Sequence, residues 1–134
     1  MKKIGAITVG QTPRTDLIPE IGPILGESIE IIQMGGLDGL TKEEIQTMTP
    51  APGDHVLVSR LKDGSSVSFG ESHILPRLEA CMDQLKKDQV SLILFLCTGE
   101  FPDTFQADVP LIFPSKILTS IVSAIHPRHL TVMT

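Results

Sequence analysis

A cysteine followed by polar residues comes directly after the most apolar segment of the chain. Residues 91–96 read SLILFL, and Cys97, Thr98, Gly99 and Glu100 follow them. A thiol can act as an acid, a base or a nucleophile, and nearby backbone amides lower its pKa. We therefore take Cys97 as the candidate catalytic residue and expect the Thr98 and Gly99 amides to form an anion-binding turn that lowers its pKa. A packed thiol is the alternative for Cys97, and a solvated loop carboxylate is the alternative to a general acid or base for Glu100.

A second polar group, which includes Gln11, Thr12 and Arg14, follows the apolar segment at residues 3–9. Arg14 stands just before an expected helix, where a guanidinium could bind a carboxylate or a phosphate. Gln11 and Thr12 add amide and hydroxyl donors. The alternatives are a solvated surface arginine for Arg14 and a turn cap for Thr12.

Asp38 lies in a third polar segment, GGLDGL at residues 35–40. An aspartate among glycines most often forms a turn. It is also the nearest obvious counter-charge for Arg14 if the two loops lie at one edge of a sheet. We therefore include Asp38 with Gln11, Thr12, Arg14, Thr98, Gly99 and Glu100 as candidate substrate-binding residues.

The elements that must position these residues alternate between strand and helix along the chain. Asp16 is the expected N-cap of the first helix, and Thr41 with Glu44 predicts a capping box for a short second helix. Such alternation is typical of an α/β fold with a mainly parallel sheet and helices on both faces. Ligands bind beyond the carboxyl ends of the strands in such sheets. The expected strands are residues 3–9, 28–34, 91–96 and 109–113.

The middle and the end of the chain depart from this alternation of strand and helix. Residues 56–60 and 66–69, joined through an Asp-Gly pair, predict a β-hairpin extension. Helical spacing after Ser72 places Cys81 on a core face, and a last helix after Pro114 is expected to turn its apolar residues inward. Residues 130–134 resemble the start of another strand. We therefore expect residues 1–134 to be a single α/β domain cut near the boundary of a longer protein.

Composition excludes several classes of partner. The net charge is −5 with no run of either sign, and neither Trp nor Tyr is present, which argues against nucleic-acid binding and against an anionic membrane surface. The apolar part of the N-terminus is too short for a signal peptide, so we expect a cytoplasmic protein. The four histidines have no metal-ligand spacing, and no glycine segment matches a P-loop or a dinucleotide fingerprint. We expect neither a metal nor a cofactor.

Four of these segments, taken together, resemble the AroM family over the whole length of the chain. They are GQTPR at residues 10–14 followed by Asp16, GLDGL at 36–40, LCTGEFP at 96–102, and Pro114-Ser115 before a helix. The family is similar to the aspartate/glutamate racemase superfamily, whose members hold the ligand between two similar α/β domains. This resemblance implies that residues 1–134 are the N-terminal domain of a two-domain protein.

The resemblance also implies a reaction. In that superfamily each domain contributes one cysteine, and the two thiols remove and return a proton on opposite faces of the substrate's α-carbon. Cys97 stands where the first cysteine would be, although Thr98-Gly99 replaces the Asn-Thr that usually follows. We expect a cofactor-independent racemase, isomerase or lyase that acts on a small carboxylate. The alternative is a ligand-binding or regulatory protein linked to aromatic amino-acid metabolism that has lost the chemistry.

Because only one thiol is expected to be available, we expect residues 1–134 alone to lack racemase activity. Apolar surface near Phe101, Phe113 and Leu130 would then be left exposed. Such surface should make the chain prone to form a homodimer.

Overall fold

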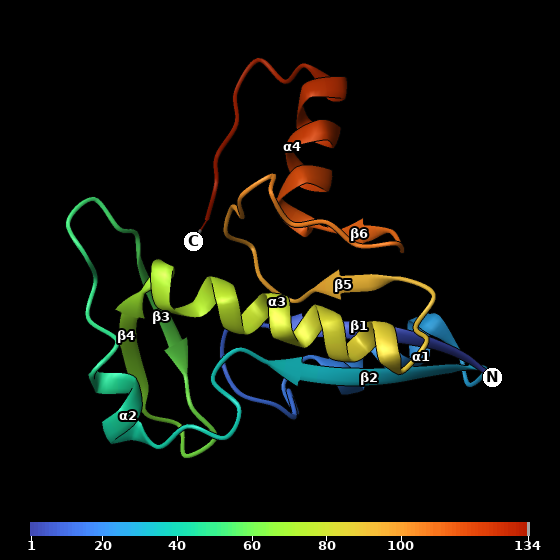
Figure 1. The fold of residues 1–134 in the computed structure, drawn as a ribbon. Coiled ribbons are helices and arrows are strands. Elements are labelled where there is room, and N and C mark those ends of the chain that lie inside the picture. Colours follow the sequence, from blue (N-terminus) through green and yellow to red (C-terminus); the bar gives the residue numbers. More distant parts are fainter. Residues whose placement is uncertain (134) are drawn as a thin grey trace.

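Four parallel strands form the central sheet, in the spatial order β2-β1-β5-β6 (Figure 1). The computed structural model describes residues 1–133. β1 pairs along its whole length with β2, and β5 pairs with β1 and with β6. The predicted parallel α/β sheet is confirmed. The strands are β1 (Lys2–Thr8), β2 (Ile29–Gly35), β5 (Ile93–Phe95) and β6 (Leu111–Ile112).

Helices lie on both faces of this sheet, as the sequence predicts. From β1 the chain passes through α1 (Ile18–Leu25) to β2 on one side, and later returns through α3 (Glu71–Lys87) to β5 on the other side of β1. Right-handed crossovers that move in opposite directions place their helices on opposite faces. In Figure 1, α3 crosses in front of the sheet and α1 lies behind it.

The core lies mainly between the sheet and α3. Ile74, Leu78 and Leu85 of α3 are fully buried. Gly5 of β1 permits a close approach of this helix, because a Cβ there would lie 2.7 Å from Leu85 Cδ1. Cys81 is 6% exposed, and its thiol donates to the Gly35 carbonyl at 3.8 Å. The prediction that Cys81 belongs to the core is therefore confirmed.

The β-hairpin extension is confirmed as a separate two-stranded sheet. Its strands, β3 (Val56–Arg60) and β4 (Ser66–Gly70), are antiparallel, and Gly64 in the turn has a positive φ of 84°. Leucine, valine and phenylalanine side chains of one face pack into the core, whereas the other face is exposed. α2 (Lys42–Gln46) begins with the predicted capping box of Thr41 and Glu44.

The start of α1 differs from the prediction. Leu17 occupies the N-cap position, and no side chain caps the helix. The carboxylate of Asp16 instead accepts hydrogen bonds from Arg14 Nε and Nη2 at 2.8 and 2.7 Å. The guanidinium offers two charged donors, which a carboxylate prefers to one backbone amide.

α4 (Pro114–Ile125) is amphipathic as predicted, but its apolar residues do not face inward. No residue of this helix is buried. Helical periodicity predicts an apolar face without specifying what covers it. Here α4 follows an edge strand of only two residues and stands away from the sheet (Figure 1). The apolar side chains that are between 48% and 68% exposed are Ile117, Leu118, Ile121 and Ile125.

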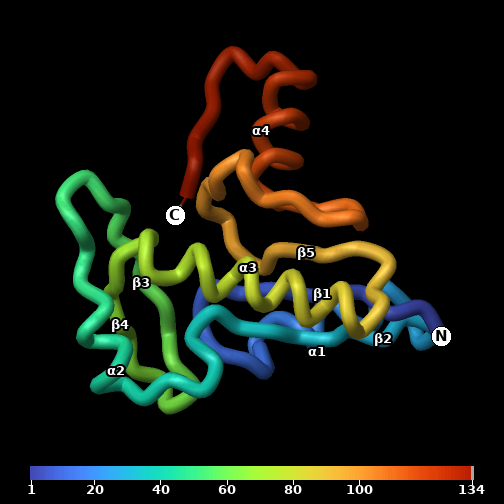
Figure 2. The backbone as a smooth tube through the Cα atoms, viewed as in Figure 1, coloured from blue at the N-terminus to red at the C-terminus, as the bar shows by residue number. Residues whose placement is uncertain are grey.

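The expected strand at residues 130–134 is not formed over residues 130–133, and Thr134 lies outside the described residues. His126 ends α4 in the left-handed conformation, with a φ of 49°. The chain then turns back past α4 (Figure 2), so it does not reach the edge of β6. Within residues 1–133, no helix has the length and the apolar character that crossing a membrane would require.

Candidate functional site

The polar segments identified from the sequence follow strands of one parallel sheet, so they lie at its carboxyl edge. β1 and β5 are neighbours, but the chain leaves β1 toward β2 and leaves β5 toward β6. Adjacent loops that part in this way create the crevice in which open α/β sheets bind ligands. The loops that follow β1 and β5 are residues 9–17 and 96–110.

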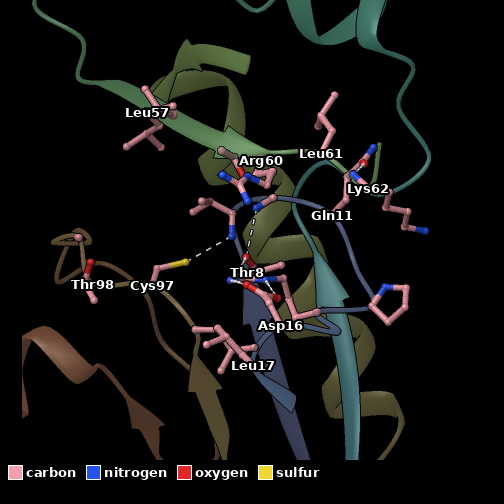
Figure 3. Close-up of a pocket in the computed structure, with 18 of the residues that line it drawn as sticks. Thr8, Gln11, Asp16, Leu17, Leu57, Arg60, Leu61, Lys62, Cys97 and Thr98 are labelled. Carbon is pink, nitrogen blue, oxygen red and sulfur yellow. Dashed lines mark hydrogen bonds and ion pairs between the residues drawn. The ribbon is translucent and has the colours of Figure 1, made fainter. Parts of the chain in front are cut away.

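A cleft of about 650 Å³ opens at this position. Three segments line it together with Glu71 at the start of α3: the end of β1 with its loop, the loop after β5, and the hairpin residues Leu57 to Lys62 with Gly64. Figure 3 shows Cys97 and Thr98 on one side of this space and the hairpin on another. A volume of this size accommodates a small metabolite.

Cys97 lines the cleft, and its sulfur accepts a hydrogen bond from the backbone N–H of Val9 at 3.3 Å. Burial raises the pKa of this thiol, and the Val9 amide, the Thr8 hydroxyl and the Arg14 charge only partly oppose that effect. The expectation of a lowered pKa is therefore wrong. The amide that reaches the sulfur is that of Val9, directly after β1, and no Thr98 or Gly99 amide is among the groups that lower this pKa, so desolvation dominates.

Thr8 is the buried polar residue of the site, and the sequence analysis missed it. It is 1% exposed, and its hydroxyl accepts hydrogen bonds from Arg14 Nη1 at 3.1 Å and from the Gly10 amide at 3.3 Å. With both donors directed at its oxygen, the hydroxyl proton is free to point at Cys97, whose pKa it lowers. Its position as the last residue of β1 was the only sequence signal.

Arg14 lines the cleft but is already paired. Its partner is Asp16, whose pKa this contact lowers to about 2, and the same contact raises the pKa of Arg14. Asp38 is therefore not the counter-charge of Arg14, contrary to the sequence analysis. The Arg14 amide also donates to Gln33 Oε1 at 2.8 Å, which fixes the loop against β2.

Asp38 and Thr12 bind each other at the same sheet edge and do not line the cleft. The carboxylate of Asp38 accepts from the Thr12 amide at 2.8 Å, from the Thr12 hydroxyl at 2.6 Å and from the Gly35 amide at 2.7 Å. From α3, Arg77 donates to the Asp38 carbonyl at 2.8 Å and to the Gly36 carbonyl. These contacts hold the loop after β1 to the loop after β2.

Gln11 lines the cleft, but both ends of its amide are used. Its oxygen accepts from the Lys62 amide at 3.0 Å, and its nitrogen donates to the Leu40 carbonyl at 3.5 Å. Gly10 lies so close to Ser59 that a Cβ would collide with the serine hydroxyl. The loop after β1 therefore fastens the hairpin to the sheet, and the hairpin side chains of the cleft, including Arg60, are site residues that no local sequence pattern indicated.

The remaining predicted residues, Thr98, Gly99 and Glu100, also line the cleft and are exposed. Aromatic packing supports the loop that carries them, because Phe95 contacts three other phenylalanines with ring centroids 4.7 to 5.9 Å apart. These three phenylalanines are Phe101, Phe105 and Phe113. Among residues 1–133, no group of three metal-ligating side chains comes together.

Comparison with known proteins gives one match. The family model described as "AroM protein" matches residues 4–134. The chain belongs to the AroM family. No curated protein and no solved structure matches the chain. The resemblance drawn from the GQTPR, GLDGL and LCTGEFP segments is thereby confirmed at the level of the family.

Proposed function

We propose that this AroM protein binds a small carboxylate in the cleft beyond β1 and β5, and that Cys97 transfers a proton to or from the ligand's α-carbon without a cofactor. The observation that carries the proposal is the position of Cys97. Its sulfur lines a cleft at the point where the loops part, and a backbone amide and a buried hydroxyl are directed at it.

The raised pKa of Cys97 supports a role as the acid of this exchange. At neutral pH the thiol is protonated, so it serves as the acid that delivers a proton to a carbanion. Removal of the first proton needs a base on the opposite face of the α-carbon. The other cysteine of the chain, Cys81, is on the buried face of α3 and does not line this cleft. We propose that a second domain, or a second copy in a homodimer, supplies the base on the opposite face of the α-carbon. We also propose that the protein acts in the cytoplasm, where free thiols persist.

The test follows deuterium from solvent into the α-position of small amino acids and hydroxy acids, with proton exchange and stereochemical inversion measured separately by NMR. We expect a monomer of residues 1–134 to invert no substrate. Where a base on the opposite face is present, inversion should depend on Cys97. Cys97→Ser should abolish inversion, and any exchange that remains should occur with retention of configuration, because the opposite base returns a proton to its own face. Cys81→Ala, the control, should retain inversion once its folding is verified. Inversion that survives Cys97→Ser contradicts the proposal.

Loss of the chemistry, leaving a ligand-binding protein, is the second candidate function. The same raised pKa favours it, because a neutral, desolvated thiol is a poor nucleophile and a poor base. In that case small carboxylates bind in the cleft with equal affinity to the wild-type chain and to Cys97→Ser, and no α-proton exchanges. Parallel binding and exchange measurements on these two proteins distinguish the two functions.

A further inference from the structure

The hairpin brings a second arginine into the cleft. Arg60 is the last residue of β3, it is exposed to solvent, and it lines the cleft together with Cys97. Figure 3 shows it above Thr8, near the centre of the site. The hairpin is held there by Gln11 and by its close packing against Gly10. The backbone that carries Arg60 is therefore held at the wall of the cleft.

The two arginines of the cleft differ in what they already bind. Arg14 donates to Asp16 through two nitrogens and to Thr8 through the third, so its charge is balanced. Among residues 1–133, the guanidinium of Arg60 has no hydrogen bond and no ion pair. Lys62, the other cation of the lining, lies on the far side of Gln11 from Cys97 (Figure 3).

We propose that Arg60, and not Arg14, binds the anionic group of the cleft's ligand, and that this group is a carboxylate. The inference rests on the proposed function. A guanidinium with free N–H groups binds a carboxylate through two parallel hydrogen bonds, which fixes its orientation as well as its position. The carboxylates of Glu71 and Glu100 also line the cleft, and they repel an anion from the rest of the wall.

Two alkylating reagents of nearly equal size test this assignment. Iodoacetate carries the carboxylate, and iodoacetamide is its neutral counterpart. Both alkylate a thiolate with loss of iodide, so their rate ratio at Cys97 cancels the thiol's own reactivity. The ratio is measured by mass spectrometry of the Cys97 peptide and is compared with the ratio for a free thiol in the same buffer.

We expect Arg60→Gln to lower the iodoacetate-to-iodoacetamide ratio by about threefold to tenfold, the range for one partly exposed charge-assisted contact. The iodoacetamide rate should stay unchanged, which also shows that the site has kept its fold. The matched control is Arg128→Gln, which removes an exposed arginine outside the cleft lining and should leave the ratio at its wild-type value.

Other results overturn the assignment. A ratio that is the same in wild type and in Arg60→Gln shows that Arg60 binds no carboxylate here. A ratio that falls in Arg14→Gln but not in Arg60→Gln assigns the anion to Arg14, and the proposed function stands without this inference. Failure of both reagents to modify Cys97 in the folded protein, even at a pH where the thiol is deprotonated, contradicts the proposed function itself, because no ligand could then reach the thiol.

Discussion

The hydroxyl of Thr8 connects the charged residues of the site to its thiol. It accepts from Arg14 and from Gly10, and it lowers the pKa of Cys97. A valine at this position has nearly the same shape but neither accepts nor donates a hydrogen bond. Thr8 is thus a positioning residue whose contribution can be measured through Cys97.

We therefore expect Thr8→Val to raise the pKa of Cys97 further, because it removes one of the contacts that oppose burial. The pH dependence of iodoacetamide alkylation at Cys97 measures this pKa. Thr8→Ser, which keeps the hydroxyl, should restore the wild-type profile. An unchanged profile in Thr8→Val would show that the hydroxyl does not act on the sulfur.

The side chain of Asp38 supports the site from outside the cleft. Asp38→Ala leaves the Thr12 and Gly35 amides without their partner, so we expect the free energy of unfolding to fall by about 2–3 kcal/mol. Urea denaturation measures the loss. The control Asp83→Ala, at an exposed position of α3, should change stability by less than about 0.5 kcal/mol. Equal effects would contradict this role of Asp38.

At the scale of elements, α3 and α4 show how far periodicity predicts structure. Both helices have an apolar face at helical spacing, and the sequence analysis placed both faces inward. The α3 face is buried because the sheet and β4 lie against it, whereas the α4 face is exposed. Periodicity predicts the existence of an apolar face, and tertiary structure decides whether it is covered.

Two leucines test this difference directly. Leu78→Ala on α3 should lower the free energy of unfolding by about 2–5 kcal/mol, because it opens a cavity in the core. Leu118→Ala on α4 removes the same atoms from an exposed side chain and should cost less than about 1 kcal/mol. Chemical denaturation of both variants gives the comparison. A large loss in Leu118→Ala would mean that α4 packs against the remainder of the chain in solution.

Of the site residues, the sequence predicted only those that directly follow the end of an expected strand. Cys97, Arg14 and Gln11 follow apolar segments, so the parallel sheet brings them to one edge. The sequence gives no sign that the Val9 amide reaches Cys97, because those residues are 88 positions apart. Nor does it indicate that Lys62 meets Gln11 across 51 positions and so carries Arg60 into the cleft. Contacts between residues so far apart in the sequence depend on the path of the whole chain.

At the scale of the whole molecule, the two thiols make the free energy of unfolding depend on pH in the alkaline range. Burial raises the folded-state pKa of both Cys81 and Cys97 above the unfolded value of about 8.5. The folded protein therefore holds these protons more tightly. Their contribution to stability is fully present below pH 8.5 and is lost as pH rises through the folded pKa values.

We expect the free energy of unfolding to decrease between pH 8.5 and the higher folded pKa values, by about 1.4 kcal/mol for each unit of pH per thiol that titrates only in the unfolded state. Urea denaturation at a series of pH values measures this decrease. Cys97→Ser should make the decrease shallower, because a serine hydroxyl does not titrate in this range. Stability that rises with pH in this range would contradict the raised pKa values.

The central claim is that the cleft beyond β1 and β5 binds a small carboxylate next to Cys97. The most direct measurement is an NMR titration of the ¹⁵N-labelled chain with small amino-acid and hydroxy-acid carboxylates, and with their uncharged amides as controls. We predict that the carboxylates, more than the amides, shift the backbone resonances of Val9, Gly10, Cys97 and Gly99. Shifts centred instead on Ser115 and Lys116, in a smaller pocket between the start of α4 and the loop after β5, would contradict the claim, as would no shifts with any compound.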